Sequence, residues 1–86
     1  MRTEENFCVY AIQSTVSNRV YVGQTDNMER RLREHNDGRV KSTKREVPWK
    51  ILSVEVFDER SEARWCENSL KRSKGKRADW LKKNQV

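Results

Sequence analysis

The sequence predicts a small two-layer α+β domain, a three-stranded antiparallel sheet flanked by helices in the order ββαβα, with a short C-terminal helix added. Two apolar runs of strand length lie close together near the start, and a third follows a basic stretch. Segments with helical periodicity lie between and after these runs. Helices with one apolar stripe need a sheet to cover. Because the chain has 86 residues, we expect one domain spanning 1–86.

The first two strands are expected at 7–13 and 19–25, joined as a hairpin by turn-forming residues. The first run, FCVYAIQ, is apolar on both faces, which indicates a central strand. An even number of loop residues would put Tyr10 and Tyr21 on the same face, and an odd number would separate them. Gly23 indicates either a close backbone approach or simply the end of the second strand.

The first helix is expected to begin with a capping box, in which Asp26 is the N-cap and Glu29 reaches back to it. The pattern predicts that the helix runs to about Asn36 and stops at Gly38. Residues four apart share a helix face. Two such pairs define an apolar stripe and a polar face that borders it: Met28 with Leu32, and Arg31 with His35.

The second half of the chain is expected to hold a strand at 49–57 and two helices. Ser61 is the expected cap of the first of these helices, which covers 62–73 and is broken by Gly75. The last helix, at 78–84, is short. Two bulky side chains would dock it on the body of the domain: Trp80 and Leu81.

One carboxylate lies at the edge of a buried helix face. The apolar stripe of the helix at 62–73 is formed by Ala63, Cys66 and Leu70. At 100° per residue, Glu67 lies about 60° from Leu70 and about 40° from Ala63. A buried charge is costly unless a cation or a metal ion compensates it. Glu67 therefore either binds such a partner, pairs with a Lys or Arg, or turns out to solvent.

The net charge of +6 is concentrated in the second half of the chain. Residues 39–86 hold fourteen Lys and Arg against seven Asp and Glu, whereas residues 1–38 hold five against six. Two segments carry the excess, 39–50, which includes an expected loop at 39–48, and the C-terminal stretch 71–86. A localised positive field favours nucleic acid as a partner, and a merely solvated surface is the alternative.

Composition also narrows the class of protein. The chain has no apolar run long enough for a membrane span and no signal-peptide pattern, so we expect a soluble cytoplasmic protein. Its two cysteines, Cys8 and Cys66, lie in apolar patterns and form no CxxC pair. We therefore expect two reduced core thiols and neither a disulfide nor a zinc site.

None of these signals is specific alone, but their combination is. The segments C-V-Y at 8–10 and Y-V-G at 21–23, then Arg31 with His35, then Glu67, resemble the GIY-YIG nuclease superfamily. The resemblance covers about residues 7–74. It is strongest to the small stand-alone bacterial members, which are similar to the catalytic modules of the UvrC repair nuclease and the Slx1 structure-specific nuclease.

The resemblance implies metal-dependent hydrolysis of DNA phosphodiester bonds, in DNA repair or recombination. Glu67 would hold one Mg²⁺ or Mn²⁺ ion. Arg31 would neutralise charge on the phosphate, and Tyr10 would orient or deprotonate the attacking water. Tyr21 would support by hydrogen bonding, and His35 would relay a proton or contact phosphate.

Other residues would bind the substrate. Gly23 would let the backbone approach closely, and basic residues would hold DNA through its phosphates with little sequence readout. These basic residues come from the two positive segments: Arg39, Lys41, Lys44, Arg45, Lys71 and Arg72. A protein partner could supply further specificity.

The sequence departs from the family pattern at three places. Cys8 stands for the first glycine and Val22 for isoleucine, and neither Asn68 nor Asn84 matches the C-terminal asparagine of many members. Two alternatives to an active endonuclease therefore remain open. One is a non-catalytic nucleic-acid-binding module or a nuclease subunit that needs a partner, and the other is a small structural or partner-binding protein.

Overall fold

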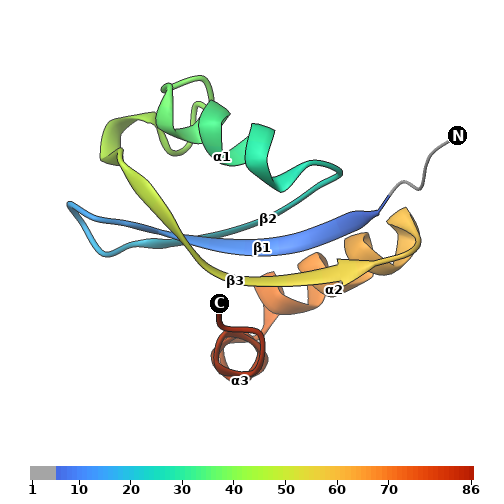
Figure 1. The fold of residues 1–86 in the computed structure, drawn as a ribbon. Helices are drawn as coiled ribbons and strands as arrows, with labels where there is room; N and C mark the ends of the chain where they lie inside the picture. The colour runs from blue at the N-terminus through green and yellow to red at the C-terminus, as the bar shows by residue number, and fades with distance from the viewer. Residues whose placement is uncertain (1–5) are drawn as a thin grey trace, which may run out of the picture.

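A computed structural model describes residues 6–86 and contains, in that range, one three-stranded antiparallel sheet and three α-helices (Figure 1). The sheet order is β2-β1-β3, so the first strand is central, as its continuous apolar run predicted. The α+β class and the element order are confirmed. The elements are β1 (Phe7–Ser14), β2 (Val20–Thr25), α1 (Met28–Asn36), a 3-10 turn (Lys44–Glu46) in the basic loop, β3 (Trp49–Phe57), α2 (Arg60–Arg72) and α3 (Lys74–Lys83).

The hairpin register places the two tyrosines on one face. Tyr10 pairs with Gly23, and Ile12 pairs with Tyr21, so odd positions face even ones across the ladder. The two tyrosine rings lie 6.5 Å apart between centroids. The loop between the strands closes with Asn18 at a φ of 65°, a left-handed conformation that asparagine tolerates well. Six residues separate the paired Gln13 and Val20, so the alternative with an even number of connecting residues is confirmed.

Helices cover both faces of the sheet, so the molecule has a helical layer on each side where the sequence suggested only two layers. α1 lies on one face, and α2 and α3 lie on the other (Figure 1). Residues of β1 point alternately to the two sides, and each is buried from Cys8 to Ile12. This burial on both sides explains why the strand reads as an unbroken apolar run.

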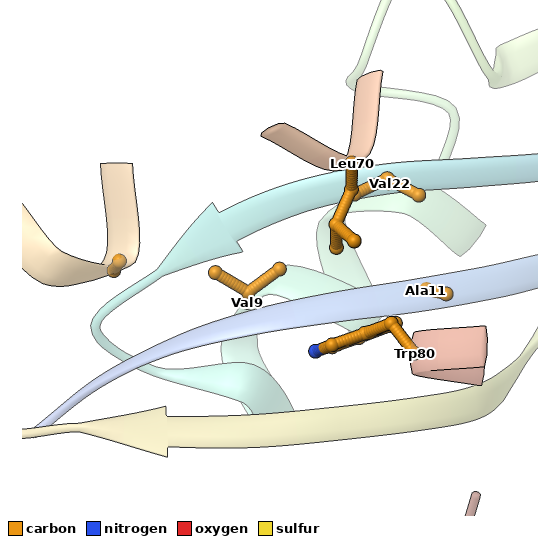
Figure 2. Close-up of a cluster of buried hydrophobic side chains, with 6 residues drawn as sticks. Val9, Ala11, Val22, Leu70 and Trp80 are labelled. Carbon is orange, nitrogen blue, oxygen red and sulfur yellow. The ribbon is translucent and has the colours of Figure 1, made fainter. Parts of the chain in front are cut away.

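Two apolar clusters hold the layers together. The one beneath α2 and α3 is centred on Val9 and Ala11, with Val22, Leu70 and Trp80 packed around them (Figure 2). The other lies under α1 and is built on Tyr10, Ile12 and Trp49. The second cluster contains a buried tyrosine, whose hydroxyl needs a hydrogen-bond partner inside the protein.

The predicted start of α1 is wrong by one residue. Asn27, and not Asp26, is the N-cap, because its side-chain oxygen accepts a hydrogen bond of 2.9 Å from the backbone N–H of Arg30. Asp26 instead pairs with the Arg30 guanidinium at 2.9 Å. Glu29 is exposed in the first turn and does not cap the helix. Asn and Asp cap helices about equally well, so composition alone did not separate the two neighbours.

The predicted limits of the last two helices also need correction. Ser61 is not a cap, since α2 already begins at Arg60. Gly75 does not break the chain, because the break falls at Ser73, which is extended and ends α2. The Ser73 hydroxyl accepts a hydrogen bond of 3.2 Å from the N–H of Lys76 and so starts α3. The cap residue overrides the weaker helix-breaking tendency of glycine.

The last helix docks on the sheet as expected. Trp80 is buried, and its indole N–H donates a hydrogen bond of 2.8 Å to the carboxylate of Glu55 on β3. Ser53 donates its hydroxyl to the carbonyl of Leu81 at 2.7 Å. Both cysteines are free thiols, as predicted. Within residues 6–86, every helix is too short or too polar to cross a membrane.

Candidate functional site

The site is centred on the hydroxyl of Tyr10, which lies at the middle of the central strand. It contacts Nε2 of His35 at 2.8 Å and accepts a hydrogen bond from Nε of Arg31 at 3.4 Å. Arg31 and His35 lie one turn apart on α1, and so reach the same point from the same helix face. We call Tyr10, Tyr21, Arg31 and His35 the tyrosine cluster.

Gly23 lies directly opposite Tyr10 in the sheet. A Cβ atom at this position would lie 2.7 Å from the Tyr10 hydroxyl oxygen, closer than such atoms come in real proteins. The glycine therefore makes room for the tyrosine side chain. Of the two interpretations of Gly23, the close backbone approach is correct.

His35 has a second partner that fixes its tautomer. Its Nδ1 lies 2.8 Å from Oγ1 of Thr43, and the same hydroxyl donates to the carbonyl of Val40 at 3.4 Å. A hydroxyl has one proton to donate. Thr43 therefore accepts from Nδ1–H, which leaves Nε2 free to accept the proton of the Tyr10 hydroxyl. The result is a directed chain from Arg31 through Tyr10 and His35 to Thr43.

Both central groups are neutral near pH 7. Burial raises the pKa of Tyr10 to about 12, and the hydrogen bond and positive charge of Arg31 partly oppose this shift. Burial, helped by the charge of Arg31, lowers the pKa of His35 to about 4. A neutral imidazole is able to accept a proton at Nε2, whereas an imidazolium is not.

Tyr21 links the cluster to the rest of the core. Its ring centroid lies 5.2 Å from that of His35 and 6.5 Å from that of Trp49, both in edge-on contacts. On its other side, the ammonium of Lys71 lies 5.8 Å from the ring centroid. Tyr21 thus stands between the buried cluster and the helix that carries Glu67.

Glu67 is mostly buried, with a side chain only 13% exposed, and both of its oxygens are occupied. Oε1 accepts a hydrogen bond of 2.7 Å from the side-chain amide of Gln24 on β2. Oε2 pairs with the ammonium of Lys71, one turn later on α2, at 2.7 Å. Of the alternatives for this carboxylate, pairing with a lysine is the one found in this structure.

The chemistry of Glu67 fits a single hard cation. Mg²⁺ and Mn²⁺ prefer carboxylate oxygen, and Mg²⁺ often keeps several waters beside one or two protein ligands. Gln24 holds the carboxylate in place by a hydrogen bond, as supporting residues do at metal sites. No cluster of three His, Cys, Asp or Glu side chains suited to a metal occurs between residues 6 and 86. Any ion at Glu67 would take its other ligands from water and substrate.

The structure thus brings some of the predicted site residues together and leaves others apart. Tyr10, Tyr21, Gly23, Arg31 and His35 form one cluster, and Glu67 with Lys71 adjoins it through Tyr21. The predicted basic residues of the loop and the end of α2 are exposed, and in the described chain none of them hydrogen-bonds to the cluster: Arg39, Lys41, Lys44, Arg45 and Arg72.

Sequence reasoning missed Gln24 and Thr43. Gln24 lies 43 residues before its partner Glu67, and Thr43 lies in an irregular loop eight residues after His35. No helical or strand periodicity relates such positions. The sequence offered one signal, and it concerned Gln24: this polar residue directly follows Gly23, at a point where the strand leaves the core.

The chain matches a known family over most of its length. The model of the GIY-YIG catalytic domain matches residues 6–83. A UPF0213 protein from Bacillus licheniformis is 34% identical over 70 residues, which cover 80% of this chain and 72% of that protein. A UPF0213 protein from Streptococcus pneumoniae is 37% identical over 67 residues, covering 76% of this chain and 68% of the other.

A eukaryotic relative is much longer. The structure-specific endonuclease subunit slx1 from Aspergillus terreus is 39% identical over 82 residues. The match covers 80% of this chain but only 21% of that protein. The chain is thus similar to one part of the fungal subunit.

Proposed function

This chain belongs to the GIY-YIG family, and on that basis we propose that it is an endonuclease that hydrolyses DNA phosphodiester bonds with one divalent metal ion. The observation that carries the proposal is the tyrosine cluster. It places a guanidinium and a proton acceptor on one tyrosine hydroxyl, beside a helix that carries a mostly buried carboxylate. Phosphoryl transfer needs exactly such charge stabilisation and positioning of the nucleophile.

The metal would be Mg²⁺ or Mn²⁺ held by Glu67, and it would supply charge stabilisation for the leaving oxygen. Arg31 would bind the scissile phosphate. Its guanidinium donates through Nε to Tyr10 and through Nη1 to Glu34 at 3.0 Å, and its side chain is 32% exposed. These contacts hold the planar fork in place and leave part of it open to an anion.

Tyr10 would act as a relay and not as a free base. Burial raises its pKa to about 12, so a bare tyrosinate is costly at neutral pH. In the relay, the attacking water gives a proton to the tyrosine oxygen while Tyr10 passes its own proton to Nε2 of His35. The oxygen of water then bonds to phosphorus as the leaving oxygen departs. No free tyrosinate forms, and the imidazolium is stabilised by the incoming phosphate charge.

We further propose a role in DNA repair or recombination, together with a protein partner that supplies specificity. This proposal is supported by the likeness to a structure-specific endonuclease subunit. The shared segment is about a fifth of that subunit, so recognition of particular DNA structures would need surfaces beyond this module. We propose that residues 1–86 work as a single catalytic domain in such an assembly.

A non-catalytic DNA-binding module is the second candidate. The Glu67–Lys71 ion pair favours it, because the carboxylate that would hold the metal already has a cation. In that case Glu67 would serve to place Lys71 for phosphate binding. The two candidates differ in whether removing the Glu67 charge affects bond cleavage or only binding.

The deciding experiment is nicking of supercoiled plasmid and of flap and branched oligonucleotides, with Mg²⁺ or Mn²⁺ against EDTA. The variant Glu67→Gln keeps the shape of the side chain, and Glu62→Gln is a matched control at an exposed position of the same helix. We expect metal-dependent cleavage in the wild type and in Glu62→Gln and none in Glu67→Gln. Salt-sensitive binding without cleavage in all three proteins would favour the binding module.

A further inference from the structure

We propose that two basic pockets along the outer edge of β2, one on each side of Glu67, bind the DNA phosphates that flank the scissile one. The inference rests on the proposed function, whose substrate path it defines. It assigns phosphate-binding roles to Arg60 and Arg77, which lie outside the tyrosine cluster. We call these the Arg60 pocket and the Arg77 pocket.

The Arg60 pocket has a volume of about 230 Å³ and lies where β2 ends. Three guanidinium groups line it, from Arg30, Arg31 and Arg60, together with Gln24. One carboxylate also lines it, that of Asp26, and it is paired with Arg30 at 2.9 Å. The positive charge in the lining therefore exceeds the negative charge.

Arg60 is held ready for an anion. Its guanidinium lies 4.9 Å from the centroid of the Phe7 ring, in a cation–π contact. Stacking on an aromatic ring fixes the plane of the guanidinium and directs its N–H groups outward at the rim, where an anion is able to accept from them. A phosphate is the ligand that such a fork suits best.

The Arg77 pocket has a volume of about 410 Å³ and lies at the other end of β2. Three residues of β2 line it, Val20, Tyr21 and Val22, and Lys71 and Arg77 supply the charge. Among residues 6–86, its lining contains two cations and no carboxylate. Arg77 donates through Nη1 to the carbonyl of Leu70 at 3.3 Å, which orients the guanidinium and leaves its other N–H groups available.

The two pockets flank the candidate reaction centre. Gly23, which meets the Tyr10 hydroxyl, lies between the strand residues that line each pocket. Glu67 is joined to the Arg60 pocket through Gln24 and to the Arg77 pocket through Lys71. Along the edge of β2, the Glu67 carboxylate therefore lies between the Arg60 pocket and the Arg77 pocket.

The length of β2 between the two pockets suits several phosphates of one DNA strand. Tyr21 and Thr25 lie four residues apart, about 13 Å along a strand. Each strand of a DNA duplex carries one phosphate per ~3.4 Å of axis, so several consecutive phosphates face such a length. Within residues 6–86, β2 is an edge strand that pairs only with β1, so no other strand of this range blocks the approach.

The first test is the salt dependence of DNA binding, measured by fluorescence anisotropy in EDTA so that no metal-dependent cleavage occurs. The variants are Arg60→Gln and Arg77→Gln, with exposed positions on the same helices, Arg64→Gln and Lys74→Gln, as controls. Losing one phosphate contact lowers the slope of log K against log salt by about 0.9. We expect that loss in each pocket variant and less than half of it in each control. Equal effects in pocket and control variants would overturn the proposal.

A second test separates binding from structural damage. Arg77→Lys removes the planar fork but keeps the charge, so it should retain most of the slope that Arg77→Gln loses. Substrates with one neutral methylphosphonate next to the scissile position add a direct pairing test. Neutralising the phosphate on one side should weaken DNA binding by the wild type and leave binding by Arg60→Gln unchanged. Neutralising the phosphate on the other side should weaken binding by the wild type and leave binding by Arg77→Gln unchanged. If the arginine substitution and the neutral phosphate weaken DNA binding independently, so that their effects add, the assignment is contradicted.

The same proteins distinguish this inference from the proposed function. If Glu67→Gln abolishes metal-dependent cleavage but the pocket variants bind DNA and its neutralised forms like the controls, the endonuclease proposal stands. The proposal of two phosphate-binding pockets is then overturned. If Arg60 and Arg77 each prove to contact one particular phosphate but none of the proteins cleaves DNA, the two pockets are supported and the endonuclease proposal is overturned.

Discussion

Tyr10 is the residue on which the candidate chemistry depends. Its buried hydroxyl sits between a cation, Arg31, and a neutral proton acceptor, His35, and it lies against a residue that has no side chain. A buried hydroxyl with fixed partners is held in one position. Small changes around it should therefore affect activity more than stability.

Replacing Gly23 with alanine should disturb this position directly. The new Cβ would lie 2.7 Å from the Tyr10 hydroxyl oxygen, so the ring must shift within a packed core. Overpacking of this kind costs about 1–3 kcal/mol of unfolding free energy. We expect Gly23→Ala to lose that much in chemical denaturation and to lose most of its cleavage activity. Unchanged stability and activity would show that the ring moves freely.

His35 should make the stability depend on pH. Its pKa is lowered to about 4 in the folded protein, against an ordinary value near 6.5 when the chain is unfolded. Between these values the unfolded state binds more protons, so the unfolding free energy falls as pH drops from about 6.5 to 4. The loss should be on the order of 2 to 3 kcal/mol.

The check is chemical denaturation of the wild type and of His35→Gln at neutral and mildly acidic pH. The variant lacks the titrating group, so its unfolding free energy should fall less over the same interval. Parallel pH profiles for the two proteins would assign the acid sensitivity to other groups.

At the scale of elements, α2 carries both Glu67 and the cation that covers it. Lys71 lies one turn after Glu67, so the ion pair forms within the helix and requires no other part of the fold. Lys71 is half exposed and able to swing away, whereas Glu67 is held by Gln24 on the sheet. A metal ion would displace the mobile partner and keep the fixed one.

Lys71→Gln should therefore bind Mn²⁺ more tightly than the wild type, because the ion no longer competes with the ammonium. An ion pair with one half-exposed partner contributes on the order of 1 kcal/mol, so the gain should be roughly fivefold in affinity. Titration followed by electron paramagnetic resonance of free Mn²⁺ measures it, with Lys74→Gln as a control of equal charge. Equal affinity in wild type and both variants would mean that Lys71 does not compete at Glu67.

The junction of α2 and α3 gives a prediction about stability alone. Gly75 lies in the first turn of α3, and a Cβ there would meet no atom of the described chain, residues 6–86, within 4 Å. Alanine restricts the unfolded chain and favours the helix, so Gly75→Ala should stabilise the protein by about 0.4–1 kcal/mol. Thermal or chemical denaturation would show it. A loss of stability would mean that the turn after Ser73 needs the freedom of glycine.

At the scale of the whole molecule, the position of β2 at the edge of the sheet determines what the site is able to reach. Helix α1 and helix α2 lie on opposite faces of the sheet (Figure 1), and residues of both helices line the Arg60 pocket at the end of β2. The excess positive charge of residues 39–86 is spread over a loop and two helices, yet only Lys71, Arg77 and Arg60 among the cations after residue 38 line the pockets beside Glu67.

The local sequence pattern alone determined which face of its strand or helix several site residues occupy. Continuous burial of β1, the shared face of Arg31 and His35, and the stripe-edge position of Glu67 all follow from strand and helix periodicity. The shared face of Tyr10 and Tyr21 depended in addition on the register of the hairpin. Periodicity operates over one element, and so it predicts which face a residue occupies.

The tertiary structure decided which partners those faces meet. Gln24 on Glu67, Thr43 on His35, and the choice of Arg60 and Arg77 over the loop cations depend on elements brought together from distant parts of the chain. The start of α3 at Ser73 depends on a single cap hydrogen bond. The reason is physical: a face is a property of local backbone geometry, whereas a hydrogen bond or an ion pair is made only where packing of the whole chain places both groups.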